Sequence, residues 1–348
     1  MKCGIVTVYN SENCGSFLQA YALMKSVESL GHEAYFPEHS FYDHSVSYFN
    51  VAKTYFKLLL KLNFKSIRLT RKRRKNYKRA LKVFNLCKQN AKLDCYFFGS
   101  DVIWDLSSSY FKNHADFFWG YRFKDVKKIA YATSIGFAQQ EHIDKNQWIA
   151  SALKDYAAIG IRDGQTKNCL QPLTDIEMKT VCDPTLLLKV EDYKKIAAPV
   201  EYDNYILTYY YGKMEESGVN ILKQIAKEED LKIISLTYSR DVPWADVVEA
   251  FDPLRFLSFC KNAKYIITNS FHGTVFSNIF SKKFVCFHVK HTQKTTDFLK
   301  KYKMEDKETD DSNEIKAILH SNYDYETTQE LIEETRDKGI DFIKNALR

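Results

Sequence analysis

Short apolar runs alternate with amphipathic segments along most of the 348 residues of the chain. Each run has the length and the β-branched or aromatic content of a buried strand, and the segments between them carry apolar residues at helical spacing. Strands that alternate with helices are typical of parallel α/β folds. The expected strands cover residues 3–10, 34–36, 94–98, 128–133, 158–161, 205–210, 232–236, 265–268 and 284–287.

A polar stretch with a proline at residues 189–204 divides this pattern into two halves. We therefore expect two Rossmann-like domains, at residues 1–190 and 204–320, which face each other across a cleft. Residues 305–320 are polar and acidic, and we expect them to form a loop. An amphipathic helix at residues 325–348 is expected to close the chain.

The clearest local pattern is AKYIITNSFHGTVFSNIFSKKFVC at residues 263–286, which predicts a strand, a tight turn, a helix and a second strand. Ser270 is a good helix N-cap, and Gly273 allows a close approach of the backbone. His272 then lies at the strand–helix junction, where free N–H groups and the helix dipole favour an anion. One interpretation of His272 is acid–base chemistry. The other is a histidine that only caps the turn.

The first expected strand leads into a loop, SENCGS, at the start of a helix. In parallel α/β folds this loop lies where ligands bind. Its polar residues Asn13, Ser16 and Gln19 form either the rim of a ligand cleft or the caps and packing of the helix. The loop has neither a GxGxxG nor a GxxxxGK[ST] pattern, so no dinucleotide or P-loop site is expected.

Two further strands are followed by charged residues. Asp101 comes after the strand at 94–98 and is suited to an acceptor contact or proton transfer, or to capping the next turn. Arg162 ends the strand at 158–161, and its planar guanidinium suits bidentate binding of carboxylate or phosphate. The alternative for Arg162 is a surface ion pair with Asp163.

Cationic residues also follow the strand at 284–287. The sequence HVKHTQK contains two histidines and two lysines, Lys290 and Lys294. This composition favours an anion-binding loop. A metal site is disfavoured because the cluster contains no carboxylate.

Composition narrows the functional classes. Hydrophobic residues make up 45% and charged residues 27%, which is ordinary for a soluble globular protein. We see no N-terminal signal and no apolar run that approaches the ~20 residues of a membrane span. The eight cysteines are scattered without metal-ligand spacing, as expected for reduced thiols. We therefore expect a cytoplasmic protein.

Much of the formal net charge of +7 comes from a basic helical segment at residues 51–93, with the run RKRRK at 71–75. Three interpretations stay open. The segment is a solvated helical arm, or its residues 65–82 contact an anionic membrane surface or attract anionic substrates. The third is nucleic-acid binding, but no recognised nucleic-acid module accompanies the charge.

Several motifs together resemble one family. SFHGTVFSNIF is similar to the C-terminal motif of the polysaccharide pyruvyl transferases, and SENCGSFLQAYALMKSVESLGHEAYF resembles the start of that family. FFGSDVIW, IAYATSIG, GIRD and VCDPTLLL lie between them in the family's order, so the resemblance spans roughly residues 3–300. It implies a GT-B-like fold and transfer of pyruvate from phosphoenolpyruvate to two sugar hydroxyls as a ketal.

The resemblance also implies roles in donor binding. His272 would be the general acid or a phosphate contact, while Arg162 and Lys294 would hold the carboxylate and the phosphate. This chain has Ser-Phe-His-Gly where some relatives have Arg-Leu-His, so phosphate binding would rely more on Lys294 or on the backbone. Lys290 is the alternative lysine. The expected donor-binding residues are Ser270, Gly273, Thr274 and Lys290.

On the acceptor side, Asp101 would take a proton from a sugar hydroxyl, and Trp104 would stack on a sugar face. Asn13, Ser16 and Gln19 would complete this side. The chemistry requires no metal and no cofactor besides the donor phosphoenolpyruvate. The expected partner is a lipid-linked saccharide in surface or extracellular polysaccharide biosynthesis, with the protein peripheral on the inner face of the membrane through residues 65–82.

Two other functions compete with this one. A GT-B-like glycosyltransferase that uses a nucleotide sugar would need the same two domains and the same anion site. A basic scaffold that binds anionic polymers through residues 65–82 is the third possibility, and it would show a steep salt dependence. No specific nucleic-acid partner is expected.

Overall fold

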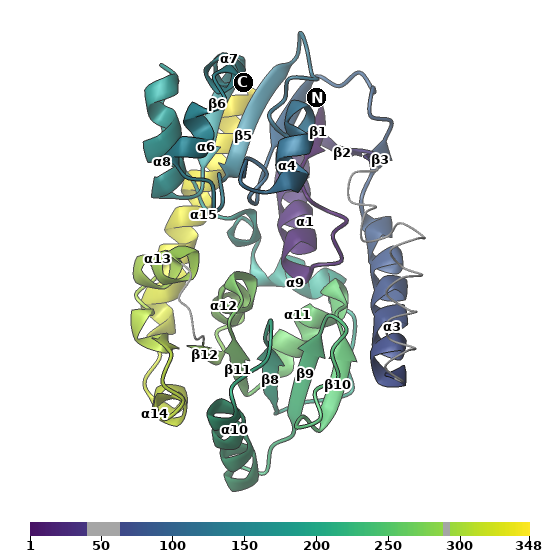
Figure 1. The fold of residues 1–348 in the computed structure, drawn as a ribbon, viewed down its shortest axis with the longest axis vertical. Coiled ribbons are helices and arrows are strands. Elements are labelled where there is room, and N and C mark those ends of the chain that lie inside the picture. Colours follow the sequence, from purple (N-terminus) through teal and green to yellow (C-terminus); the bar gives the residue numbers. More distant parts are fainter. Residues whose placement is uncertain (40–62, 288–292) are drawn as a thin grey trace.

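The computed structural model describes residues 1–39, 63–287 and 293–348, which form two parallel sheets (Figure 1). The first sheet has the strand order β3-β2-β1-β4-β5-β6-β7. Its central strands are apolar runs buried on both faces, as in β4, where all four residues are buried. The strands are β1 (Lys2–Val6), β2 (Glu33–Pro37), β3 (Leu86–Cys87), β4 (Cys95–Phe98), β5 (Lys127–Thr133), β6 (Tyr156–Ile161) and β7 (Met178–Thr180).

The second sheet has the order β10-β9-β8-β11-β12-β13, and all its pairings are parallel. The α/β class predicted from the alternation of strands and helices is therefore confirmed. The strands are β8 (Ile206–Tyr209), β9 (Ile233–Thr237), β10 (Val247–Ala250), β11 (Tyr265–Thr268), β12 (Lys283–Phe287) and β13 (Glu308–Thr309).

Helices connect the strands and cover the sheets. None of them, in the described parts of the chain, is long and apolar enough to cross a membrane. The helices are α1 (Cys14–Ser29), α3 (Phe64–Ala80), α4 (Ser109–Asn113), α5 (Ala115–Phe118), α6 (Gln140–Asp144), α7 (Trp148–Lys154), α8 (Gly164–Leu170), α9 (Val190–Ile196), α10 (Glu216–Glu228), α11 (Pro253–Asn262), α12 (Phe271–Ile279), α13 (Gln293–Lys301), α14 (Glu314–His320) and α15 (Tyr325–Leu347).

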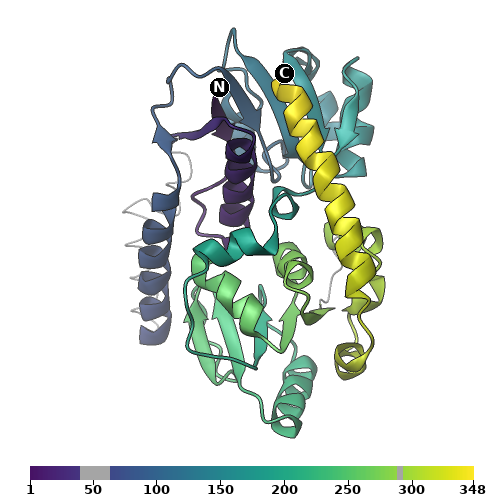
Figure 2. The ribbon, with the colours of Figure 1, turned by 180° about the vertical axis from the view of Figure 1, so that it is seen from behind.

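The C-terminal helix α15 runs from the second sheet back to the first (Figures 1 and 2). Phe342 packs on Tyr131 of β5, and it lies 3.0 Å from the position that a Cβ on Gly160 of β6 would occupy. The Arg336 side chain donates hydrogen bonds to the carbonyls of Leu186 and Leu188. The amphipathic helix therefore buries its apolar side against the first domain.

The expectation of a loop at residues 305–320 is wrong. These residues contain β13 and the helix α14. Ile315 and Leu319 of α14 are fully buried beside the second sheet. The apolar residues of α14 are few and lie between polar and acidic residues, so the hydrophobic pattern did not indicate a helix.

The described part of the basic segment, the helix α3, is packed rather than free. It lies along the β10 edge of the second sheet (Figure 1), where the side chains of Lys72 and Glu249 pair and Arg79 Nη2 lies 2.6 Å from Asp252 Oδ2. α3 is therefore not a free arm, because one side of it packs on the protein, while most of its basic side chains are exposed to solvent. Residues 51–62 lie outside the described residues. The membrane and polyanion interpretations stay predictions.

Candidate active site between the two sheets

The N-termini of two helices, α1 of the first domain and α12 of the second, lie next to each other between the domains. Asn13 caps α1, and its Oδ1 accepts a hydrogen bond from the Gly15 N–H at 2.8 Å. Ser270 caps α12. A Cβ on Gly15 would lie 2.0 Å from Nδ1 of His272, so only glycine permits this approach. Both helices thus present their positive ends to one place.

Charged side chains from the carboxyl edge of the first sheet gather around His272. Nη1 of Arg162, at the end of β6, lies 3.4 Å from Asp183 Oδ2 and 3.9 Å from Asp101 Oδ1. Asp183 follows β7, and its Oδ1 lies 3.8 Å from Nε2 of His272. Asp183 Oδ1 also accepts hydrogen bonds from Thr185, which hold the carboxylate in place.

Lys294 of α13 completes the cluster. Its Nζ lies 3.8 Å from the centre of the Phe271 ring, a cation–π contact. Arg162, Asp183, Phe271 and Lys294 all line a pocket of about 230 Å³. The pocket therefore presents an arginine and a lysine from different domains to one small ligand.

Burial and mutual charge shift the pKa of His272, Lys294, Asp101 and Asp183. Burial lowers the pKa of His272 to about 4, against the opposing effect of Asp183, so the imidazole is neutral at pH 7. Burial and the charge of Arg162 lower the pKa of Lys294 to about 8. Burial pushes the pKa of Asp101 and Asp183 upward, but the charges of the neighbouring cations outweigh it and keep both below the usual range.

Two buried side-chain nitrogens in the cluster lack a hydrogen-bond partner within the described residues. They are Nε2 of His272 and Nε of Arg162. A buried polar group without a hydrogen bond costs roughly 1–3 kcal/mol, so such atoms point to a ligand or water that satisfies them. With Lys294 beside them, the fitting ligand is a small anion with several oxygen atoms.

The structure brings together most of the predicted site residues. His272, Arg162, Lys294 and Asp101 share the cluster, and Ser16 Oγ donates to Asp101 Oδ2 at 3.1 Å. Asn13 is half-buried and acts as a helix cap, one of its two interpretations. Their roles in catalysis stay predictions. Lys290, the alternative lysine, lies outside the described residues.

The alternative interpretation of Arg162 is wrong. Asp163 turns away to cap α8, where its Oδ1 accepts hydrogen bonds from the backbone N–H and the hydroxyl of Thr166. Arg162 faces the interdomain cluster instead and is nearly buried.

Trp104 cannot stack on a sugar as predicted. Its side chain is 0% exposed and lies stacked on Trp119, with ring centres 4.6 Å apart. Its indole N–H donates to the carbonyl of Phe118. Trp104 is a core residue of the first domain, and a sequence window cannot reveal the Trp119 ring that covers it.

Gln19 and Thr274 are also wrongly placed on the ligand side. Gln19 is fully buried, and its amide N–H₂ donates to Thr7 Oγ1 and to two carbonyls. The Thr274 hydroxyl is buried against Ser270 O and Cys286 Sγ. Gly273 makes its close approach to Thr268 Oγ1, 2.1 Å from the position that a Cβ would occupy, rather than to a ligand. Of the expected anion hole, the α12 N-terminus at Ser270 remains.

Sequence reasoning missed Asp183 as a site residue. The motif VCDPTLLL contains it, directly after the short strand β7. An acidic residue at the carboxyl end of a parallel strand is a signal for a ligand edge, as it was for Asp101. The strand has only three residues, so the pattern did not identify it.

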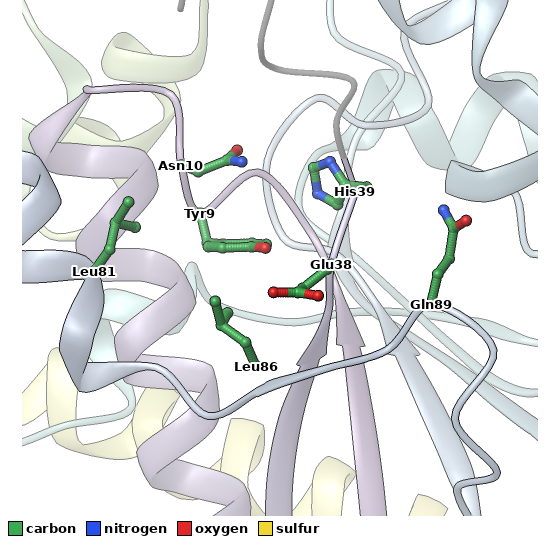
Figure 3. Close-up of a pocket in the computed structure, with 7 residues that line it drawn as sticks. All are labelled: Tyr9, Asn10, Glu38, His39, Leu81, Leu86 and Gln89. Carbon is green, nitrogen blue, oxygen red and sulfur yellow. The ribbon is translucent and has the colours of Figure 1, made fainter.

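A separate pocket of about 500 Å³ opens at the carboxyl ends of β1 to β3 (Figure 3). Its lining includes the Glu38 carboxylate and no lysine or arginine among the described residues. It therefore does not suit a polyanion. In the same described residues, no group of three or more histidine, cysteine, aspartate or glutamate side chains could hold a metal ion. The residues that line this pocket are Tyr9, Asn10, Glu38, His39, Leu81, Leu86 and Gln89.

Comparison with known proteins gives a family and a fold. The family model described as polysaccharide pyruvyl transferase matches residues 13–291. The fold is similar to that of the UDP-GlcNAc 2-epimerase from Neisseria meningitidis, with a TM-score of 0.52 and 10% identity over 100% of this chain and 99% of that chain. None of the curated proteins compared with the chain matches it.

A second similar structure is a putative UDP-N-acetylglucosamine 2-epimerase from Listeria monocytogenes. Its TM-score is 0.51 and its identity 9%, over 98% of this chain and 90% of that chain. At such low identity the likeness concerns the fold alone. It confirms the predicted arrangement of two Rossmann-like domains.

Proposed function

Because the chain belongs to the polysaccharide pyruvyl transferase family, we propose that it transfers the pyruvyl group of phosphoenolpyruvate to two hydroxyls of a saccharide. The product is a cyclic ketal, and inorganic phosphate is released. The acceptor belongs to a surface or extracellular polysaccharide.

The observation that carries this proposal is the pair of buried side-chain nitrogens without partners. They are Nε2 of His272 and Nε of Arg162, and Arg162 and Lys294 line a pocket of about 230 Å³. Phosphoenolpyruvate carries a carboxylate and a phosphate on a three-carbon unit. The Arg162 fork suits the carboxylate, while Lys294 and the α12 N-terminus suit the phosphate.

The reaction adds two hydroxyls to C2 of the donor. The first hydroxyl oxygen bonds to C2 while C3, the methylene carbon, receives a proton. The bond from C2 to the phosphate oxygen then breaks, and its electron pair leaves with the phosphate. The second hydroxyl oxygen bonds to C2, and its proton leaves with the phosphate. Atoms and charge balance without an oxidant or a metal.

We assign His272 as the acid that protonates C3. In the free site its pKa is about 4, so it must gain a proton when the donor binds. The phosphate and carboxylate bring negative charge next to the imidazole, and this charge raises the pKa. Asp183, 3.8 Å from Nε2, stabilises the imidazolium. Asp101, held by Ser16, is the base for the attacking hydroxyl.

Calorimetric titration with phosphoenolpyruvate tests the donor site. We expect saturable binding accompanied by proton uptake near pH 7, measured in buffers of different ionisation enthalpy. Arg162→Lys should weaken binding by about tenfold or more, because lysine cannot form the planar fork. His272→Ala should abolish the proton uptake.

The matched control is Arg122→Lys, at a surface ion pair with Asp116, and it should bind as the wild type does. Wild-type affinity in Arg162→Lys would remove Arg162 from the donor site. A nucleotide sugar that protects the protein thermally while phosphoenolpyruvate does not would replace the proposal with a glycosyltransferase.

A further inference from the structure

The helix α3 carries a row of exposed side chains, nearly all basic, that the proposed reaction does not use. Its members are three or four residues apart, so they share one side of the helix. The row continues into the 3₁₀ turn that follows the helix, and it is roughly 27 Å long at the helical rise. We call it the basic stripe, and it consists of Phe64, Arg68, Arg71, Lys75, Lys78 and Lys82.

The basic stripe lies opposite the face by which α3 packs on the protein. With about 3.6 residues per turn, the buried positions of the helix and the stripe point in roughly opposite directions. Two contacts fix the buried face: Asn76 Nδ2 donates to the Phe251 carbonyl, and Arg73 pairs with Glu12. The stripe is therefore held in one orientation, towards solvent.

Ion pairs divide the basic residues of α3 into two sets. The set that pairs with carboxylates of the second domain recurs every seven residues and consists of Lys65, Lys72 and Arg79. In the stripe, Lys75 and Lys78 form no ion pair with any described residue. Residues 63–93 contain no aspartate or glutamate, so no acidic group of this segment neutralises the stripe. The stripe therefore presents uncompensated positive charge to a partner.

The composition of the stripe favours an anionic membrane surface as this partner. Its side chains are cations and one aromatic ring, and the ring of Phe64 is 64% exposed. At a bilayer surface the cations contact anionic headgroups, and an apolar side chain beside them enters the boundary with the acyl chains. A nucleic acid would be read by amide and hydroxyl groups as well, and the stripe contains none.

We propose that α3 docks lengthwise on the anionic surface of a lipid bilayer, with the basic stripe on the headgroups and Phe64 inserted between them. The inference does not depend on the proposed pyruvyl transfer, because it uses only the outer face of α3. The inner face of the same helix pairs with Glu12, in the loop that leads to Gly15 and the candidate active site. Docking of α3 therefore sets the orientation of that site relative to the bilayer.

Vesicle flotation tests the charge of the stripe. The protein is mixed with vesicles of phosphatidylcholine alone or of equimolar phosphatidylcholine and phosphatidylglycerol, and the bound fraction is measured over a series of salt concentrations. We expect binding to the anionic vesicles only, and weaker binding as salt rises. Each lysine near such a surface strengthens binding by about fivefold, so Lys75→Gln/Lys78→Gln should weaken it by about tenfold or more.

Two further variants identify the surface and the kind of partner. Lys223→Gln/Lys227→Gln is the matched control, because it removes two exposed lysines from α10, which pairs with α14 rather than with α3. It changes the net charge equally and should bind vesicles as the wild type does. Phe64→Ser should weaken binding to anionic vesicles several-fold and leave binding to heparin, a soluble polyanion, unchanged.

Binding to anionic vesicles that the α3 variants weaken and the α10 variant leaves unchanged supports the proposal. No binding to these vesicles, or equal losses in the α3 and α10 double variants, overturns it. Binding of heparin or duplex DNA without vesicle binding overturns it in favour of a polyanion partner. Phosphoenolpyruvate titration separates this inference from the proposed function, because the donor site is intact in Lys75→Gln/Lys78→Gln and the vesicle result stands whether or not the donor binds.

Discussion

The contact between Gly15 and His272 is possible only because residue 15 has no side chain. They begin helices of different domains, and the imidazole occupies the space that a Cβ on Gly15 would need. In an ordinary helix, alanine is more stable than glycine by about 1 kcal/mol. Here the close approach outweighs that preference, because any side chain at residue 15 would displace the imidazole from Asp183.

We therefore expect Gly15→Ala to impair catalysis while the fold survives. A displacement of about 1 Å at a catalytic group can cost on the order of 100-fold in rate. The measurement is kcat/KM for pyruvyl transfer, together with phosphoenolpyruvate affinity. Ser29→Ala, an exposed position in the last turn of the same helix, is the control. Wild-type activity in Gly15→Ala would show that His272 has room to move without loss.

Several charged side chains of the helix α3 form ion pairs with other elements of the fold. Nε of Arg73 lies 2.8 Å from Glu12 Oε2 in the loop before α1, and both side chains are nearly buried, at 6% and 10% exposed. Arg79 and Lys72 of the same helix pair with acidic residues of the second domain. The helix thus connects the loop that precedes Asn13 and Gly15 to the far domain.

Arg73→Met should lower the free energy of unfolding by about 3 kcal/mol, because it leaves the Glu12 carboxylate buried with only the more distant Arg74 nearby. Urea unfolding measures the effect. Lys78→Met, an exposed change on the same helix, should alter stability by less than about 0.5 kcal/mol.

The double variant Arg73→Met/Glu12→Gln checks the cause. If the loss comes from the unpaired carboxylate, the second change should restore a large part of the stability. A loss that persists undiminished in the double variant would assign it to packing of the arginine stem.

At the scale of the whole molecule, a polar cluster lies between two parallel sheets, at the edge where such sheets bind ligands. α15 and α3 span both domains and hold the two edges together. Burial lowers the pKa of His272 to about 4, and burial does the same for His39 in the first domain. Among the described residues, these two buried histidines resist protonation in the folded state.

We expect the ligand-free protein to lose stability as pH falls from about 6.5 towards 4. In that window the unfolded chain binds more protons at these histidines than the folded chain does, so acid favours unfolding. The loss should be on the order of 2–3 kcal/mol for each histidine by pH 4.5. Urea unfolding at several pH values measures it, in buffers without carboxylate ligands.

The variant His272→Gln should flatten this pH dependence by about half, and His39→Gln should do the same. Unchanged pH dependence in both variants would mean that neither imidazole is buried in the neutral form. Stability that rises on acidification would contradict the sign directly.

The pattern of the sequence predicted most elements near the site. The strand-turn-helix around His272 and the helix after Asn13 depend on apolar spacing and capping residues, which act over a few positions. The pattern did not predict β7, β10 and α14, because these elements are short or interrupted by charged residues. Their order depends on pairing with distant strands rather than on local composition.

The local sequence pattern does not show which side chains are buried or which charged groups pair with one another. Trp104 could face a sugar or the core until Trp119 is known to cover it, and the cations of α3 could be free until Glu12, Glu249 and Asp252 are known to pair with them. The element types and the ligand edge follow from short-range rules, and the family resemblance of the motifs added the choice of His272, Arg162 and Lys294. Their convergence on Asp183 required packing between separate elements of both domains, because side-chain contacts between distant segments leave no periodic trace in the chain.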